Sequence, residues 1–380
     1  MDKLRIGVIG VCGRGGIANN WHDNKRSEVV GGADVSEAAL DDFRKRMGDD
    51  VFTTLEYPRL LERPDVDAIA VTAPDFMHEE LACAALEAGK HVFCEKPLAI
   101  TTAGCDRILR TWKASGKHLM VGFNMRYMNI FRVMKEIIDS GAIGELKAAW
   151  CRHFVGHGRT FYYQDWHATR EGSNSLLLQK GSHDLDMIHW LTGQYSKKVA
   201  AFGGLDMFGG DKPNDLRCPD CDEAETCWEV ADPASRRDQC CFRQEVDVED
   251  NNVMIMELDG GIKASYLQCH FTPDYHRNYT IIGTEGRLEN SEPEGRVWVK
   301  MRRANTWKEL ADRTYDIRPA MGGHGGADPV ITEDFLDMVL DGKEPLATPV
   351  AGRMSVAAGC AGADSMRSGG QVQVVPEIGW

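Results

Sequence analysis

The residue best suited to acid–base chemistry in this chain is Lys96, in the run Glu95-Lys96-Pro97. The run follows the short apolar stretch His91 to Cys94, which predicts a buried strand. A lysine at the end of such a strand can reach into a ligand cleft, where its amine can hydrogen-bond a hydroxyl and help to move that proton during hydride transfer. Glu95 could orient the amine or a cofactor ribose. For the tripeptide alone, a surface lysine before a turn proline is the alternative interpretation.

A glycine-dense loop, Gly10-Val11-Cys12-Gly13-Arg14-Gly15, follows the first apolar run of the chain. Glycines at this point of a strand–helix unit allow a tight turn and a close approach of the backbone to a pyrophosphate. Cys12 stands where the dinucleotide fingerprint has its middle glycine, and a structural turn is the alternative interpretation. Asp34 ends the second predicted strand, where a carboxylate accepts hydrogen bonds from ribose hydroxyls and repels a 2′-phosphate. The pattern therefore favours NAD over NADP. The alternative interpretation is that Asp34 only caps the following helix.

A second group of candidate residues lies farther along the chain. Lys180 and His183 are three residues apart on a predicted helix, so they share a face and can serve as base and acid or bind an anionic group. The polar positions that follow, Asp184 above all, are expected to be solvated or capping. Upstream, the loop from 152 to 170 mixes aromatic and hydrogen-bonding residues, as a carbohydrate site needs, although a structural Ω-loop is possible. The candidate substrate residues are Tyr127, Arg152, His153, Tyr163, Trp166, Arg170, Lys180 and His183, and His157 lies in the same loop.

Five of the twelve cysteines gather in an acidic, turn-rich insert at about residues 206–242. Cys218, Cys221, Cys227 and Cys240 have a spacing that predicts a closed structural zinc site. Cys241 could replace Cys240 as the fourth ligand. Incidental thiols in an exposed loop and an iron–sulfur cluster are the alternatives.

Composition excludes several classes of protein. The 380 residues carry 44 Lys and Arg against 58 Asp and Glu, a net charge of −14, so nucleic acid is not an expected partner. No apolar run approaches the roughly 18 residues of a membrane helix. The chain enters a strand pattern at once, which leaves no room for a signal peptide and predicts a cytoplasmic protein.

Two patterns of elements predict two domains. Short apolar runs alternate with helical segments up to Gly122, which predicts an α/β fold with a doubly wound parallel sheet in an N-terminal domain, residues 1–122. Beyond it, runs of hairpin character predict a C-terminal α+β domain, residues 123–380, with a large, open and mainly antiparallel sheet. Two helices near the C-terminus, 330–340 and 353–366, are assigned to this second domain.

The runs IGVIGVCGRGG, GGADVS, AVTAPDFMHEELACAALEAGKHVFCEKPLA, VGFNMRY and GSHDLDMIHWLTG resemble the glucose–fructose oxidoreductase / inositol dehydrogenase / MocA (Gfo/Idh/MocA) family. The resemblance implies a Rossmann domain with bound NAD(P), an open sheet used in oligomerisation as a dimer or homotetramer, and a small sugar or cyclitol substrate. It also implies that Lys96 is catalytic and that the loop from Thr72 to His78 lies along the cofactor. The expected cofactor-binding residues are Gly10, Cys12, Gly13, Arg14, Gly15, Asp34, Thr72, Pro74, His78, Glu95, Lys96 and Arg126.

One departure from the family pattern leaves the reaction open. The family often carries an Asp four residues ahead of the His that matches His183, and Gln179 stands there in this chain. Because Gln cannot take a proton, the usual carboxylate–histidine relay is changed. A sugar dehydrogenase is the first hypothesis. An NAD-dependent glycosidase, acting for example on sulfonated or other anionic glucosides by transient C3 oxidation and C2 deprotonation, is the second, and a non-catalytic NAD and sugar sensor is the third.

Overall fold

The computed structural model describes residues 3–156, 158–303, 305–306 and 308–379. They form two compact units. Unit 1 comprises residues 1–131, 319–356 and 377–380, and unit 2 comprises residues 132–318 and 357–376. The helix expected at 330–340 and the first turn of the one expected at 353–366 therefore pack in unit 1, although the sequence assigned them to the second domain. Chain segments this distant in sequence join one unit through packing, which local patterns do not report.

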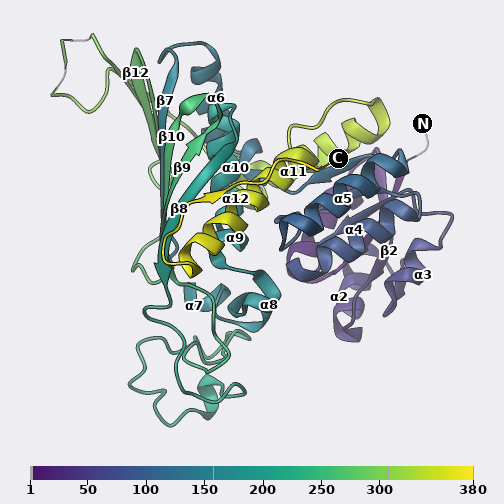
Figure 1. The fold of residues 1–380 in the computed structure, drawn as a ribbon. Helices are drawn as coiled ribbons and strands as arrows, with labels where there is room; N and C mark the ends of the chain where they lie inside the picture. The colour runs from purple at the N-terminus through teal and green to yellow at the C-terminus, as the bar shows by residue number, and fades with distance from the viewer. Residues whose placement is uncertain (1–2, 157, 304, 307, 380) are drawn as a thin grey trace. The chain divides into compact units, whose positions relative to one another are not determined.

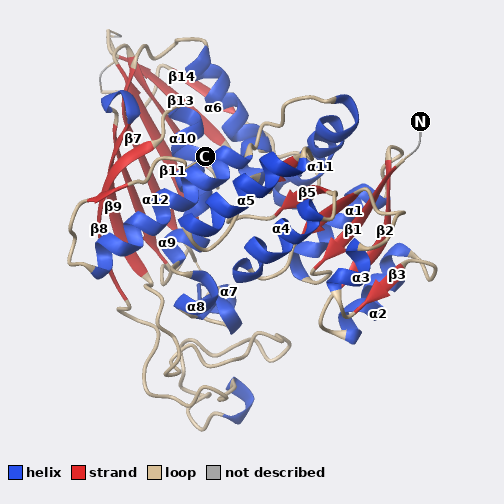
Figure 2. Cartoon of the chain, turned by 45° about the vertical axis from the view of Figure 1, so that its right-hand side comes forward, coloured by secondary structure: helices blue, strands red, loops and turns tan. Residues whose placement is uncertain are grey.

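Unit 1 is built on a six-stranded parallel sheet with the order β3-β2-β1-β4-β5-β6 (Figures 1 and 2). Right-handed crossovers from such an order put helices on both faces of the sheet. The fold class predicted for this part of the chain is confirmed. Its elements are β1 (Leu4–Ile9), α1 (Ala18–His22), β2 (Ser27–Ala33), α2 (Glu37–Met47), β3 (Phe52–Thr54), α3 (Tyr57–Leu61), β4 (Ala68–Val71), α4 (His78–Glu87), β5 (His91–Cys94), α5 (Thr102–Ser115), β6 (Leu119–Val121) and α11 (Gly323–Asp341).

Local sequence explains where several of these elements begin and end. Ser36 caps α2 by accepting a hydrogen bond from the Ala39 amide, as predicted. Gly116 ends α5 with φ of +63°, a conformation that favours glycine. The α1 side of the sheet is closed by Trp21, whose ring meets Phe93 of β5 and Phe335 of α11 edge-on, with ring centroids 5.2 and 5.6 Å away. This contact ties the late helix α11 into the parallel sheet.

Unit 2 is built on a nine-stranded sheet with the order β14-β13-β12-β11-β7-β10-β9-β8-β15. Among the described strands, every neighbouring pair is antiparallel except β7 and β10. The predicted mainly antiparallel sheet is thus confirmed. The elements are β7 (Leu146–Phe154), α7 (Gly158–Phe161), α8 (Arg170–Ser173), α9 (Leu176–Gln179), α10 (Gly181–Thr192), β8 (Ser196–Gly204), β9 (Asn251–Leu258), β10 (Lys263–Cys269), β11 (His276–Gly283), β12 (Gly286–Ser291), β13 (Arg296–Met301), β14 (Arg313–Asp316) and β15 (Gln373–Val374), while α6 (Asn129–Asp139) and α12 (Pro349–Arg367) cross the division between the units.

The two faces of this sheet differ. Helices α9 and α10 and the second half of α12 cover one face (Figure 1). Along β7 the side chains alternate, so that Cys151 and His153 are buried under the helices while Trp150 and Arg152 are exposed on the other face. Large apolar side chains, among them Trp150, Phe202, Ile255 and Leu267, remain 42–64% exposed there. The expectation that this face forms an oligomer interface stays a prediction.

The helices of the described residues can be compared with the length and hydropathy of membrane-spanning helices. Within the described part of the chain, no helix combines the length and the apolar character needed to cross a bilayer.

Candidate functional site

The glycine-dense loop lies at the carboxyl end of β1, beside the point where the strand order reverses between β1 and β4. Open parallel sheets bind ligands at this crevice. Gly10 has φ of +88°, and a Cβ on it would lie 2.6 Å from the Ala73 nitrogen. A Cβ on Gly15 would lie 2.4 Å from the Gly10 carbonyl oxygen. Neither position tolerates a side chain, whereas Cys12 is exposed, so the cysteine in place of the middle glycine is accommodated by pointing to solvent.

Thr72, Pro74 and His78 hold the segment after β4 against this loop. The Thr72 hydroxyl donates to the Gly10 carbonyl oxygen at 2.7 Å. The buried His78 ring lies between two carbonyl oxygens, with Nδ1 2.7 Å from that of Pro97 and Nε2 2.9 Å from that of Ala73. Burial lowers the pKa of His78. Pro74 precedes a single 3₁₀ turn, Asp75–Met77. Thr72 thus fastens this segment to the glycine loop, and His78 fastens it to the turn after β5.

Asp34 stands directly after β2 and keeps part of its surface exposed. Its Oδ2 accepts from the Val11 amide and its Oδ1 from the Ser36 amide, each at 3.0 Å. Ser36, and not Asp34, is the residue that caps α2. The carboxylate is fixed beside the glycine loop, where it can meet a ribose.

Arg14, in the same loop, belongs to a charged cluster of unit 1. Its Nε donates to Glu95 at 2.6 Å, and its two terminal nitrogens donate to both oxygens of Asp328 in α11, at 2.8 and 2.9 Å. Burial alone would lower the pKa of Arg14, but the two carboxylates outweigh it and raise that pKa. Bidentate pairing of this kind fixes geometry as well as charge. Arg14 therefore tethers the loop to β5 and α11.

Lys96 follows buried Glu95 at the carboxyl end of β5 and is itself partly exposed. Its backbone amide donates to Glu95 Oε2 at 3.2 Å, so the Glu95 side chain bridges the base of the lysine and the loop residue Arg14. Arg126 and Tyr127 lie in a 3₁₀ turn, Asn124–Tyr127, and are buried. The Arg126 guanidinium donates to the Leu346 carbonyl oxygen at 2.5 Å and the Tyr127 hydroxyl to Asp334 at 2.6 Å.

A buried carboxylate, Asp184, organises the helix-covered face of unit 2. Its oxygens are 2.8 Å from His153 Nδ1, 2.8 Å from the Tyr266 hydroxyl and 3.1 Å from Arg277 Nε, and the Tyr279 hydroxyl also donates to it. Burial alone would raise the pKa of Asp184, but the Arg277 charge and the donated hydrogen bonds hold it well below its usual range. The expectation of a solvated or capping Asp184 is therefore wrong, because the carboxylate joins α10 to β7, β10 and β11.

Lys180 and His183 stand at the start of the helix that Asp184 anchors. The predicted single helix is two, since α9 ends at Gln179 and α10 begins at Gly181, with Lys180 between them. Both residues keep some exposure, whereas Ser182 between them is buried. The Lys180 ammonium lies 5.5 Å from the centroid of the Tyr162 ring. Burial, and then the Arg277 charge, lower the pKa of Lys180 to about 8.

The remaining predicted substrate residues are not brought together at this face. His153 is buried against Asp184, and burial followed by the Arg277 charge lowers its pKa to about 3. Arg152, its neighbour along β7, points to the opposite face and stacks over Phe154. Tyr163 lies in an apolar cluster with its ring 4.1 Å from that of Phe208. Trp166 stacks on His167, Arg170 pairs with Glu249, and His157 lies outside the described residues.

Sequence reasoning missed Arg277, Tyr266 and Tyr279. They occupy inward positions of strands β10 and β11 that also carry apolar residues, so strand periodicity predicts only that they are buried. A charged residue at an inward position was the available signal, because a buried arginine requires a partner.

For the predicted zinc site, the side chains of the described residues contain no group of three or more His, Cys, Asp or Glu that could hold a metal ion as placed. The described cysteines are free thiols.

The order of the parallel sheet and the loop at its switch point define a dinucleotide-binding protein. Residues 4–123 match the family described as "Oxidoreductase family, NAD-binding Rossmann fold", and residues 135–374 match its "C-terminal alpha/beta domain". The chain belongs to the Gfo/Idh/MocA oxidoreductase family and has its NAD-binding unit, which confirms the resemblance seen in the sequence.

Similar proteins include the "Putative oxidoreductase YteT" of Bacillus subtilis (strain 168), 30% identical over 79% of this chain and 78% of that protein. Inositol 2-dehydrogenase of Pseudomonas fluorescens (strain SBW25) is 37% identical over 50% of this chain and 54% of its own length, so that match spans about half of each protein. Among solved structures, levoglucosan dehydrogenase in complex with NADH and L-sorbose has a TM-score of 0.80 at 20% identity, covering 99% of this chain and 100% of that one. This last likeness concerns the fold.

Asp184→Asn should lower the stability of unit 2 by about 3 kcal/mol, because it leaves the Arg277 charge buried without its counter-charge. For a unit of this size, that corresponds to a fall in melting temperature of about 6–12 °C at pH 7. Since the folded-state pKa of Asp184 is depressed, its contribution is complete above about pH 4 and is lost as the pH falls below that value. The difference between wild type and variant should therefore narrow at pH 3.

Scanning calorimetry of both proteins at pH 7 and pH 3 measures this effect. The matched control is Glu257→Gln, which breaks an exposed pair with Lys263 at 3.4 Å and should cost less than about 1 kcal/mol. Equal melting temperatures for Asp184→Asn and the control would show that the network does not anchor α10.

Proposed function

We propose that this protein is an NAD-dependent oxidoreductase that transfers a hydride between a ring hydroxyl carbon of a small carbohydrate or cyclitol and the cofactor. The observation that carries the proposal is the position of Lys96, at the carboxyl end of β5 in an NAD-binding family unit, directly after a carboxylate that is bonded to the glycine loop. The names of the similar proteins, inositol 2-dehydrogenase and levoglucosan dehydrogenase, support this class of substrate.

The cofactor fits unit 1 through features of the chain itself. Gly10 and Gly15 let the loop pack closely on its own backbone, whereas a Cβ on Gly13 or Gly16 would meet no heavy atom within 4 Å, so the backbone there is open to a pyrophosphate. Asp34 is fixed at the loop's edge. Its carboxylate would accept hydrogen bonds from the adenosine ribose hydroxyls, and its negative charge would repel a 2′-phosphate. We therefore infer a preference for NAD over NADP. When bound, the nicotinamide ring supplies the hydride acceptor.

Three side chains manage the substrate proton in this proposal. Lys96 hydrogen-bonds the reacting hydroxyl and takes its proton while the hydride leaves the carbon that bears this hydroxyl. Lys180 and His183, at the start of α10, are the acid and base candidates that unit 2 contributes. Lys180 stands next to the position of the family's frequent carboxylate, and with a pKa of about 8 a useful fraction of it is neutral near pH 7.5. Its protonated fraction also favours a substrate that carries an anionic group.

Lys180 also supports a second candidate function, the NAD-dependent glycosidase. Transient oxidation at C3 would acidify the C2 proton, and a neutral amine at position 180 is a base of suitable strength to remove it. Elimination of the aglycone, addition of water and return of the hydride would leave the cofactor unchanged.

Product analysis separates these reactions. The purified protein is incubated with inositols, free sugars, chromogenic glycosides and their anionic derivatives, with NAD, NADP or no added cofactor, while NADH and aglycone are followed. The proposal expects NADH to accumulate with a keto product, and NAD to be used in preference to NADP. Aglycone release without net NADH would instead establish the glycosidase, and binding of NAD and sugar without turnover would establish a sensor.

Lys96→Met should bind NAD with unchanged affinity yet lose turnover by about 10²- to 10⁴-fold, because the group that moves the proton is gone while the nucleotide loop is intact. Isothermal titration with NAD and steady-state rates on the substrate found above measure the two effects. Lys147→Met, at an exposed lysine of β7 paired with Glu145, is the control and should behave as wild type. Turnover within a few-fold of wild type in Lys96→Met would remove this lysine from the mechanism.

The pH dependence tests Lys180. A base acts in its neutral form, so kcat/KM of the wild type should rise with pH through an apparent pKa of about 8. Lys180→Met should lose this rising limb together with about 10²-fold or more of the rate, and Lys180→Arg should lose it as well because a guanidinium stays charged. The profile of Lys147→Met should match wild type. A rising limb that persists in both Lys180 variants would assign the titration to another group.

A further inference from the structure

The insert lies in the segment between β8 and β9, residues 205–250, which has little regular structure of its own. Its described residues form one three-residue 3₁₀ turn, Cys218–Asp220, and two isolated bridges, Lys212 with Arg243 and Arg217 with Gln239. Many of its side chains are exposed, including Trp228 at 65%. A segment with so few buried apolar contacts lacks the usual source of order, and small folds of this kind are commonly held by a cross-link or a metal.

Four cysteines of the insert converge on one small cavity. Cys218, Cys221, Cys227 and Cys240 line it together with Cys241, and its volume is about 20 Å³. This is about the space of one water molecule, and therefore of one ion.

Cys241, the alternative fourth ligand, belongs to a different environment. It is 2% exposed and packs in the apolar cluster with Tyr163, Phe208 and Val246. The other four thiols are all partly exposed, so Cys240 shares their environment and Cys241 does not.

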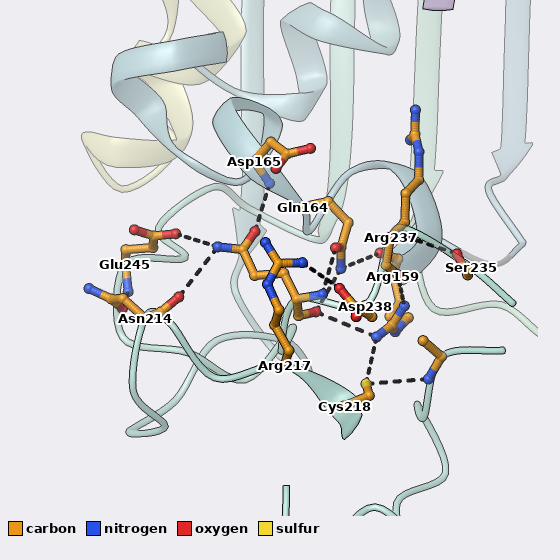
Figure 3. A network of polar contacts seen from close by, with 12 residues as sticks. Arg159, Gln164, Asp165, Asn214, Arg217, Cys218, Ser235, Arg237, Asp238 and Glu245 are labelled. Carbon is orange, nitrogen blue, oxygen red and sulfur yellow. Dashed lines mark hydrogen bonds and ion pairs between the residues drawn. The ribbon is translucent and has the colours of Figure 1, made fainter. Parts of the chain in front are cut away.

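Cys218 already accepts the kind of hydrogen bonds that stabilise a metal-bound thiolate. The Arg159 guanidinium donates to its sulfur at 3.1 Å, and the Ala231 amide does so at 3.4 Å (Figure 3). Donors of this kind lower the cost of the negative charge on a ligating sulfur. They come from two different parts of the chain, α7 and the insert, and both donate to Cys218, which lines the cavity.

We propose that Cys218, Cys221, Cys227 and Cys240 bind one structural Zn²⁺ ion in this cavity. The side chains as placed do not yet form a metal site, so binding requires the thiols to turn inward until each sulfur is about 2.3 Å from the ion. Each thiol releases its proton to solvent as its sulfur takes the metal, and nothing is oxidised or reduced.

The metal site would stabilise the loop at 159–170 as well as the insert. Residues beside Cys240 bond back to the aromatic loop: the Gln164 side chain donates to the Gln239 carbonyl oxygen at 2.8 Å, and Arg243 donates to the Tyr163 carbonyl oxygen at 2.7 Å. Arg159, at the start of that loop, donates to the Arg237 carbonyl oxygen at 2.7 Å (Figure 3). It also donates to the Glu229 carbonyl oxygen at 2.7 Å. A metal at Cys240 therefore fastens the loop at 159–170 through these backbone contacts.

Metal analysis of protein purified without chelator tests the proposal directly. We expect about one zinc per chain, released when a mercurial titrates the thiols. Cys218→Ser and Cys240→Ser should each lose at least about four-fifths of the zinc, while the matched control Cys241→Ala should keep it. Zinc below about a tenth of an equivalent in the wild type, a disulfide among these four cysteines, or iron with inorganic sulfide would overturn it.

A second set of measurements uses only the wild type, so it does not depend on whether the cysteine variants fold. Wild type reloaded with Co²⁺ after zinc removal should show sulfur-to-cobalt charge-transfer absorption typical of a tetrahedral thiolate site, and its absence would count against four thiolate ligands. Zinc removal should increase hydrogen exchange at 159–170 and 206–250 and leave residues 4–123 unchanged. Uniform exchange in both forms would exclude a fastening role. None of these readouts depends on turnover, so they stand apart from the test of the proposed function.

Discussion

The carboxylate of Asp184 is the group on which the helix-covered face of unit 2 depends. Removing a charge from water costs several kcal/mol. That cost is offset here because Arg277 forms an ion pair with the carboxylate and His153, Tyr266 and Tyr279 hydrogen-bond to it. Those donors come from three neighbouring strands, so one side chain fixes the position of α10 against the sheet. Lys180 and His183 stand at the start of that helix, and their placement follows from the anchor.

The anchor and the chemistry are coupled through Arg277. Its charge holds Asp184 ionised and also helps to lower the pKa of Lys180 to about 8, while Asp184 acts in the opposite direction. Burial is the larger cause of the lowered pKa of Lys180, and the Arg277 charge adds to it. Unit 1 solves a similar problem with Arg14, which joins the glycine loop to Glu95 and Asp328 and fixes the loop before any nucleotide arrives.

The sequence predicted the features that are local. Apolar runs marked β1, β4 and β5, and Ser36 and Gly116 marked helix ends, because such signals depend on a few adjacent residues. The partners of Asp184 could not be found in this way, since they stand 31 to 95 positions away in the chain. The same limit explains why Tyr163 was expected at the substrate and belongs to an apolar cluster instead: aromatic residues serve both purposes, and only packing distinguishes them.

Family membership assigns the fold and the nucleotide unit, so what is particular to this protein must lie in the positions that depart from the family pattern. One departure lies in unit 2, where Gln179 stands at the position of the family's frequent carboxylate and Lys180 follows it, directly before α10. The glutamine removes a negative charge at this point, and the lysine beside it adds a positive one. This change leaves the strand ends of the nucleotide unit untouched. A fold serves many substrates through local changes of this kind, because the scaffold and the residues of the site vary separately.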